Sequence, residues 1–176
     1  LNPEEFIIKA GRIINDCKAI SLIQHIQYEK RTGTFGTYIF EEATLRGTLG
    51  RDAIESTKSL YDLVVVDSEG IEKNFAESLE AEDDVVVYSK LPGGFYINTP
   101  MGKYNPDWAV AFREGTVKHI YFVAETKGND IEVSQLRHSE DAKIECARRH
   151  FAAISTGDVV YSVVKTYRDL YNAVTK

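Results

Sequence analysis

The sequence predicts an α/β fold in which helices flank a central mixed β-sheet in three layers. Two apolar runs, at residues 107–112 and 120–124, flank a short polar segment that contains Gly115, as in a β-hairpin. Further apolar runs at residues 61–67 and 85–88 are typical of strands. Segments with helical periodicity lie between and after these runs, and this alternation predicts a sheet covered by helices.

The composition is that of a folded domain. The 176 residues suffice for one domain with a sizeable core, and 43% hydrophobic with 27% charged residues argue against disorder and against a membrane protein. Two cysteines give neither a disulfide framework nor zinc-ligand spacing, which fits a reducing cytoplasm. The net charge of −6 argues mildly against a protein that grips DNA by itself.

The N-terminal part is predicted to be a helix followed by loops. Asn2 precedes a proline and two glutamates, which is typical of a capped helix start. Apolar residues then recur at helical spacing to about residue 28, namely Phe6, Ala10, Ile13, Cys17, Ile20 and Ile23. A connector to another domain and an ordinary core helix both fit this pattern. Residues 31–58 are predicted to be mostly loops, with a short strand at residues 38–40.

The strand at residues 61–67 leads into a predicted helix that Ser68 would cap and that ends near residue 80. Its apolar stripe consists of Ile71, Phe75 and Leu79. At ~100° per residue, Glu72 lies about 60° from the centre of this stripe, and Glu77 lies about 160° away. Glu72 could therefore reach a site beside the sheet, whereas Glu77 should face solvent. An exposed helical charge is the alternative for Glu72.

The remaining elements follow from similar signals. Residues 85–88 form a strand, and the Lys-Leu-Pro-Gly-Gly sequence at residues 90–94 predicts a turn. Ser139 is predicted to cap a long helix. Residues 159–164 form a last strand, and Thr166 is predicted to cap a terminal helix.

Charged residues gather at the end of the predicted hairpin that lies remote from its turn. Asp107 follows Pro106 at the start of the first strand, and Glu125, Thr126 and Lys127 end the second. Because side chains alternate along a strand, Glu125 and Lys127 share one face. Burying this charge is costly unless it is paired or bound to a metal. Two convergent carboxylates favour a divalent cation with hard oxygen ligands.

The pattern Pro-Asp at 106–107 followed by Glu-Thr-Lys at 125–127 resembles the PD-(D/E)xK nuclease signature. The resemblance extends over three longer blocks, at residues 99–109, 121–128 and 143–151. Together these blocks resemble the C-terminal endonuclease domain of the Res subunit of type III restriction enzymes. The similarity runs from about Tyr61 to the end of the chain and implies a restriction-endonuclease-like fold.

The resemblance implies Mg²⁺-dependent hydrolysis of double-stranded DNA with 5′-phosphate ends. Asp107, Glu125 and the backbone carbonyl of Thr126 are the expected metal ligands. Lys127 is expected to orient or deprotonate the attacking water. Glu72 resembles the glutamate on the first helix of many such enzymes and is the expected third acidic group.

The resemblance also implies partners. Residues 1–58 are expected to connect a helicase and translocase motor, which uses ATP, to an endonuclease domain at residues 59–176. The first residue, Leu1, is expected to be an internal position of a longer bacterial protein. Sequence specificity is expected from a Mod methyltransferase subunit, and the isolated domain is expected to be weak or silent.

Two other functions remain open. A catalytically silent docking or DNA-binding module would keep the fold without cleavage, although it would have no chemical reason to retain Asp107, Glu125 and Lys127. A small-molecule metal hydrolase would need a closed pocket, whereas a nuclease needs a groove for a duplex. The sequence contains neither a P-loop nor a Gly-x-Ser-x-Gly motif, which disfavours an NTPase or a serine hydrolase.

Overall fold

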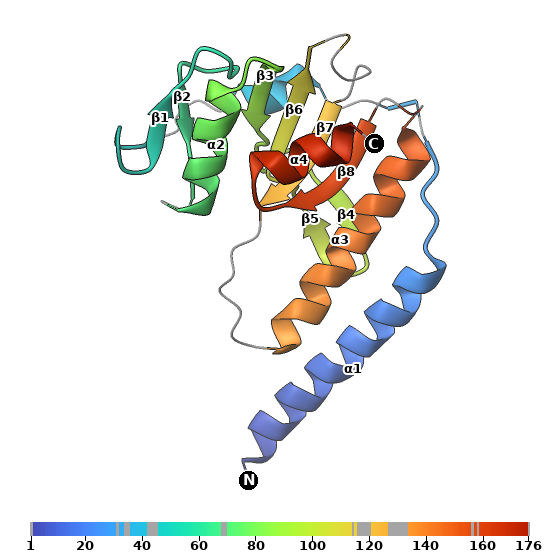
Figure 1. Ribbon diagram of the computed structural model, residues 1–176. Coiled ribbons are helices and arrows are strands. Elements are labelled where there is room, and N and C mark those ends of the chain that lie inside the picture. Colours follow the sequence, from blue (N-terminus) through green and yellow to red (C-terminus); the bar gives the residue numbers. More distant parts are fainter. Residues whose placement is uncertain are drawn as a thin grey trace. The chain divides into compact units, whose positions relative to one another are not determined.

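The computed structural model describes residues 2–30, 32–33, 36–41, 46–67, 70–113, 115, 121–126, 134–155, 157 and 159–175, with only the backbone for 121–126 and 134–139. The elements in Figure 1 are α1 (Pro3–His25), η1 (Thr37–Phe40), β1 (Ala53–Glu55), β2 (Leu63–Val65), α2 (Ile71–Ala81), β3 (Val85–Lys90), β4 (Ile97–Thr99), β5 (Gly102–Tyr104), β6 (Trp108–Phe112), β7 (Tyr121–Thr126), α3 (Ser134–Ile154), β8 (Val159–Val164) and α4 (Tyr167–Val174). Among these described segments, none of the helices has the length and apolar character needed to span a membrane.

The chain forms two compact units, each built from separate segments. The first comprises Leu1–Lys30, Ile97–Tyr104 and Asp130–Ile154; the second comprises Arg31–Tyr96, Asn105–Asn129 and Ser155–Lys176. The predicted domain boundary between residues 58 and 59 stays a prediction.

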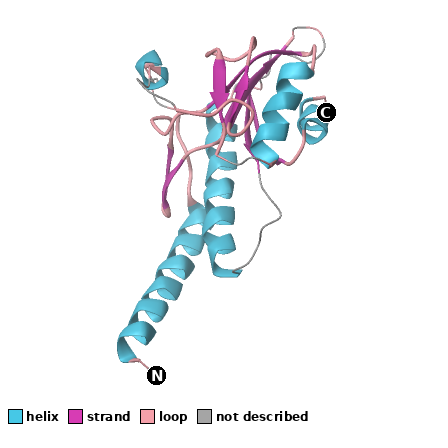
Figure 2. Cartoon of the chain, turned by 90° about the vertical axis from the view of Figure 1, so that its left-hand side faces the viewer, coloured by secondary structure: helices cyan, strands magenta, loops and turns pink. Residues whose placement is uncertain are grey.

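The first unit consists of α1, α3 and the β4–β5 hairpin. Figures 1 and 2 show α1 beside α3 in two views, and Ile23 packs there in a small core with Ala142 and Cys146. Arg149 Nη1 donates hydrogen bonds to the carbonyls of Gln24 and Ile26, at 3.2 and 3.3 Å. A basic side chain thus satisfies carbonyl groups at the C-terminal end of α1.

The predicted apolar stripe of α1 is largely exposed within the described chain. Ala19 and Ile23 are buried, whereas Phe6 at the N-terminal end is 63% exposed. Apolar residues lie on several faces of this helix, so that packing against α3 covers only part of them. The capped start is confirmed, because the Asn2 side chain accepts a hydrogen bond from the Glu4 N–H at 3.1 Å.

The second unit contains a four-stranded mixed sheet in the order β3-β6-β7-β8. Strands β3, β6 and β7 are antiparallel neighbours, and β8 pairs parallel to β7. The predicted hairpin is the β6–β7 pair, and residues 159–164 form the last strand as predicted. The α/β class with a mixed central sheet is confirmed, and it is compatible with a restriction-endonuclease-like fold.

One face of this sheet carries the core. Along β6, Trp108, Val110 and Phe112 are buried, and they join residues of α2 and α4 in one cluster. The Trp108 ring packs near both Phe75 of α2 and Tyr88 of β3, with ring centroids 5.9 and 6.2 Å away. Alternate residues of the central strand thus fix α2 against the sheet.

Helix α4 begins as predicted. The Thr166 side chain accepts from the Asp169 N–H, and the Asp169 side chain accepts from the Thr166 N–H, which forms a capping box.

Several boundaries differ from the sequence prediction. The segment predicted as a strand at residues 38–40 is the 3₁₀-helix η1, and the predicted loops contain strand β1. Ser139 does not cap α3, because this helix already begins at Ser134. The segment before Asp107 contains the unpredicted β4–β5 hairpin, whose second strand begins directly after the turn at Gly102, with a φ of 100°.

Glu80 joins α2 to the segment that precedes β2. Its carboxylate accepts hydrogen bonds from the Ser56 hydroxyl (2.6 Å), the Thr57 N–H and hydroxyl (2.8 and 2.7 Å), and the Tyr88 hydroxyl (3.1 Å). Partial burial by itself raises the pKa of Glu80, but these hydrogen bonds outweigh it and lower the pKa to about 2. The Glu80 carboxylate therefore connects α2 to β3 and to the segment before β2.

Replacing Glu80 with Gln is expected to lower the free energy of unfolding by about 1–3 kcal/mol at neutral pH, because charged hydrogen bonds are lost from a partly exposed site. Since the folded-state pKa is depressed, this stabilisation is present above the ordinary value of 4.5 and is lost as pH falls toward about 2. Urea unfolding at several pH values measures both effects. Glu77→Gln, an exposed substitution on the same helix, is the matched control. An equal loss at pH 7 and at pH 2.5 would contradict this role.

Candidate active site

Three strands of the sheet bring the predicted site residues to one edge. Trp108 at the start of β6 is paired on one side with Lys90, the last residue of β3, and on the other side with Ala124 of β7. Asp107 directly precedes Trp108, and Glu125 directly follows Ala124. The backbone therefore places residues 107 and 125 at the same edge on adjacent strands.

The backbone that leads into Asp107 is held by several contacts. The Asp107 carbonyl accepts a hydrogen bond from the Leu91 N–H at 2.7 Å, and Pro106 is fully buried. Asn105 Nδ2 donates to the carbonyls of Phe95 and Pro92, at 2.7 and 3.3 Å. Asp107 itself is half-buried. Its carboxylate is thus carried by a backbone with little freedom.

The rest of the predicted signature is described in part. Glu125 and Thr126 belong to β7, where they pair with Val163 and Val164 of β8. Their side chains, and all of Lys127, lie outside the described residues. The ligand roles of Glu125 and Thr126 and the role of Lys127 stay predictions.

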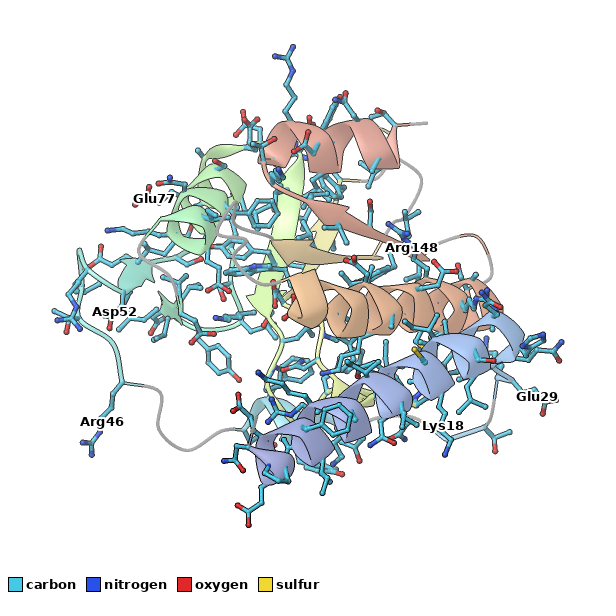
Figure 3. All side chains as sticks on the ribbon, turned by 90° about the horizontal axis from the view of Figure 1, so that it is seen from below. Lys18, Glu29, Arg46, Asp52, Glu77 and Arg148 are labelled. Carbon is cyan, nitrogen blue, oxygen red and sulfur yellow. The ribbon has the colours of Figure 1, made fainter. Side chains whose placement is uncertain are left out.

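Glu72 lies in the first turn of α2, with a side chain only 13% exposed. Its Oε2 accepts hydrogen bonds from Lys90 Nζ at 2.9 Å and from the Asp67 N–H at 2.7 Å. Glu77 is exposed, and Figure 3 shows it on the outer side of α2. Of Glu72 and Glu77, Glu72 is therefore the one that lies toward the sheet, as the helical angles predict.

Lys90 is a member of this edge that the sequence analysis missed. Its side chain is 22% exposed, and Nζ donates to Asp67 Oδ2 at 2.5 Å as well as to Glu72. Burial by itself lowers the pKa of Lys90, but the hydrogen bonds to Asp67 and Glu72 outweigh burial and raise it. The ammonium group is thus held charged between two carboxylates.

A sequence signal for Lys90 existed. The sequence predicts a strand that ends at Tyr88 and a turn that begins at Lys90. Two more strand residues would have placed Lys90 on the face of Tyr88, which packs against α2. The pairing with Asp67 and Glu72, at separations of 23 and 18 residues, gave no local signal.

A pocket of about 240 Å³ opens at this edge. Its polar wall includes Asp67, Lys90, Asn105 and Asp107, and its apolar wall includes Leu63 and Pro92 from the flanking loops and strands. Asp107 and Lys90 therefore share one concave surface, where a phosphate and a cation could both be accommodated.

The donor set at this edge fits Mg²⁺, because all its predicted ligands are hard oxygen atoms. Within the described part of the chain, no group of three or more His, Cys, Asp or Glu side chains could hold a metal ion. The carboxylate of Glu125 lies outside that part. The ammonium of Lys90 between Asp67 and Glu72 shows that this edge already accommodates a positive charge among carboxylates. The predicted ligands of this metal are Asp107, Glu125 and the Thr126 carbonyl.

Comparison with known proteins gives one match. Residues 57–167 match a family model described as an endonuclease domain, and this match spans most of the chain. Neither the curated proteins nor the solved structures contain a match to the chain. The matched segment includes α2 and all four strands of the mixed sheet, together with the edge that carries Asp107. The chain therefore belongs to this family of endonuclease domains and contains a restriction-endonuclease-like domain.

Proposed function

We propose that this chain is the endonuclease domain of a type III restriction enzyme Res subunit, which hydrolyses phosphodiester bonds of double-stranded DNA with Mg²⁺. The observation that carries the proposal is the strand register through Trp108, which puts residues 107 and 125 on adjacent strands at one edge. The match to an endonuclease domain supports nuclease activity in general. The resemblance of residues 99–109, 121–128 and 143–151 to Res subunits supports the finer assignment.

In this proposal, Asp107 and Glu125 supply carboxylate oxygens to the metal, and the Thr126 carbonyl supplies a third ligand. Mg²⁺, when bound, supplies a Lewis acid that polarises the scissile phosphate and lowers the pKa of a water ligand. Lys127 orients the attacking water, accepts or relays its proton, and offsets negative charge that develops on the phosphate. Glu72 is the third acidic group of the site.

The larger assembly is part of the proposal. The endonuclease domain comprises residues 59–176, and residues 1–58 connect it to an ATP-driven helicase and translocase of the same polypeptide. A Mod methyltransferase subunit provides sequence specificity, and the enzyme acts in the bacterial cytoplasm. The net charge of −6 fits a module that relies on a motor for much of its grip on DNA.

Lys127→Ala in the full-length enzyme, assayed with Mod and ATP, is expected to lower plasmid cleavage by about 10²–10³-fold, because transition-state charge loses a partner. ATP hydrolysis by the same preparation should remain at the wild-type rate, which separates cleavage from motor function. Lys127→Arg should also cleave DNA slowly, since the broad, planar guanidinium group of arginine does not replace the compact ammonium group of lysine. Lys18→Ala, an exposed lysine substitution on α1, is the matched control (Figure 3). Cleavage at the wild-type rate by Lys127→Ala would favour the silent docking module.

A further inference from the structure

The ion-pair cluster of Asp67, Glu72 and Lys90 places a fixed positive charge beside the proposed metal site. Lys90 Nζ donates to Asp67 Oδ2 at 2.5 Å and to Glu72 Oε2 at 2.9 Å. Lys90 and Asp67 also line the pocket that contains Asp107. A cation held by the protein thus lies on the same concave surface as a proposed metal ligand.

The carboxylate of Glu72 is committed to this cluster. One oxygen, Oε2, accepts from both Lys90 Nζ and the Asp67 backbone N–H. The side chains of Glu72 and Lys90 are 13% and 22% exposed. Moving Glu72 onto a metal would separate a largely buried ion pair and leave the ammonium with one carboxylate fewer, which is costly. The geometry therefore opposes direct ligation by Glu72 Oε2.

We propose that Lys90 is a positioning residue that keeps Glu72 out of the inner coordination sphere of the metal. Ligation is then left to Asp107 and Glu125 at the β6–β7 edge. This inference rests on the proposed function and assigns Glu72 an indirect role in it. Glu72 and Asp67 fix the Lys90 ammonium, and the ammonium offsets part of the negative charge at this edge.

Electrostatics predicts the direction in which metal affinity changes when the charge of Lys90 is removed. A fixed ammonium repels a divalent cation that approaches the same surface, and the interaction is strong where solvent is partly excluded. Removing the charge of Lys90 should therefore tighten metal binding, and it should also release Glu72 as an additional ligand. If Lys90 instead oriented Glu72 onto the metal, the same substitution would weaken binding.

The chain contains its own reporter for this test. Trp108 is the only tryptophan, follows Asp107 directly, and is paired with Lys90. Mn²⁺ accepts the same hard oxygen ligands as Mg²⁺ and quenches a nearby indole. Quenching of Trp108 fluorescence by Mn²⁺ is measured on the 176-residue chain without DNA. It gives a binding constant for the metal that does not depend on cleavage.

Lys90→Gln is expected to bind Mn²⁺ about tenfold more tightly than the wild type. Lys58→Gln, which removes the same charge from a lysine bonded to the Glu82 carbonyl, should change affinity less than about twofold. Glu72→Gln keeps an acceptor for Lys90 and should weaken binding less than about threefold in the wild-type background. In the Lys90→Gln background, Glu72→Gln should remove most of the gain in Mn²⁺ affinity. In this double variant, residue 72 has no carboxylate that could bind the metal.

Unchanged or weaker binding by Lys90→Gln overturns the proposal. A loss of Mn²⁺ affinity of tenfold or more in Glu72→Gln alone also overturns the proposal. This variant tests the proposal even if Lys90→Gln does not fold. The Asp107→Asn variant tests the proposed function itself, because it removes a proposed metal ligand. Wild-type quenching in Asp107→Asn would reject the metal site at this edge, whatever the Lys90 variants show.

Discussion

Asp107→Asn is expected to lower DNA cleavage by the full-length enzyme on the order of 10³-fold, since a metal ligand supplies several kcal/mol of transition-state stabilisation. Asn has nearly the same shape as Asp, and the hydrogen bond from the Leu91 N–H to the residue 107 carbonyl involves only backbone. Thermal unfolding of the variant beside the wild type separates a loss of catalysis from a loss of stability. Plasmid cleavage with Mod, ATP and Mg²⁺ measures the effect.

The control for this experiment is Asp83→Asn, the same chemical change in the exposed turn before β3. Asp83 precedes the start of β3, whereas Asp107 lies across from its end, so the two substitutions probe opposite ends of one strand pair. Asp83→Asn should cut at the wild-type rate. Equal cleavage by both variants and the wild type would remove Asp107 from the site, and the assignment of the hairpin edge would fail with it.

The parts of the fold that the sequence predicted well depend on local signals. The β6–β7 hairpin follows from two β-branched and aromatic runs around a glycine, and the cap of α4 follows from Thr166. The edge position of Glu72 follows from helical angles, because Phe75 and Leu79 set the buried face. Each prediction uses residues that are neighbours in sequence.

The parts that were missed depend on contacts between distant segments. The three-residue strands β1 and β4 are too short for a periodic signal, and their pairing partners decide them. The apolar residues of α1 recur at helical spacing, but periodicity does not tell how much of a helix a neighbour covers. The partners of Lys90 come from the end of β2 and the start of α2, so this charge cluster exists only in the folded chain.

Leu79→Ala is expected to have the largest effect on stability, a loss of about 3–5 kcal/mol, because a fully buried leucine leaves a cavity that its neighbours fill only partly. Leu79 is 0% exposed and belongs to the cluster that joins α2 to β3, β6 and α4. Urea unfolding should show a lower midpoint with an unchanged slope, as expected for a loss of stability without a change in exposed surface. The matched control is Leu60→Ala, which removes the same atoms from a side chain 55% exposed and should cost less than about 1 kcal/mol. Equal losses in the two variants would mean that α2 does not pack on the sheet through Leu79. In that case, the position of Glu72 beside Lys90 would also lose its structural support.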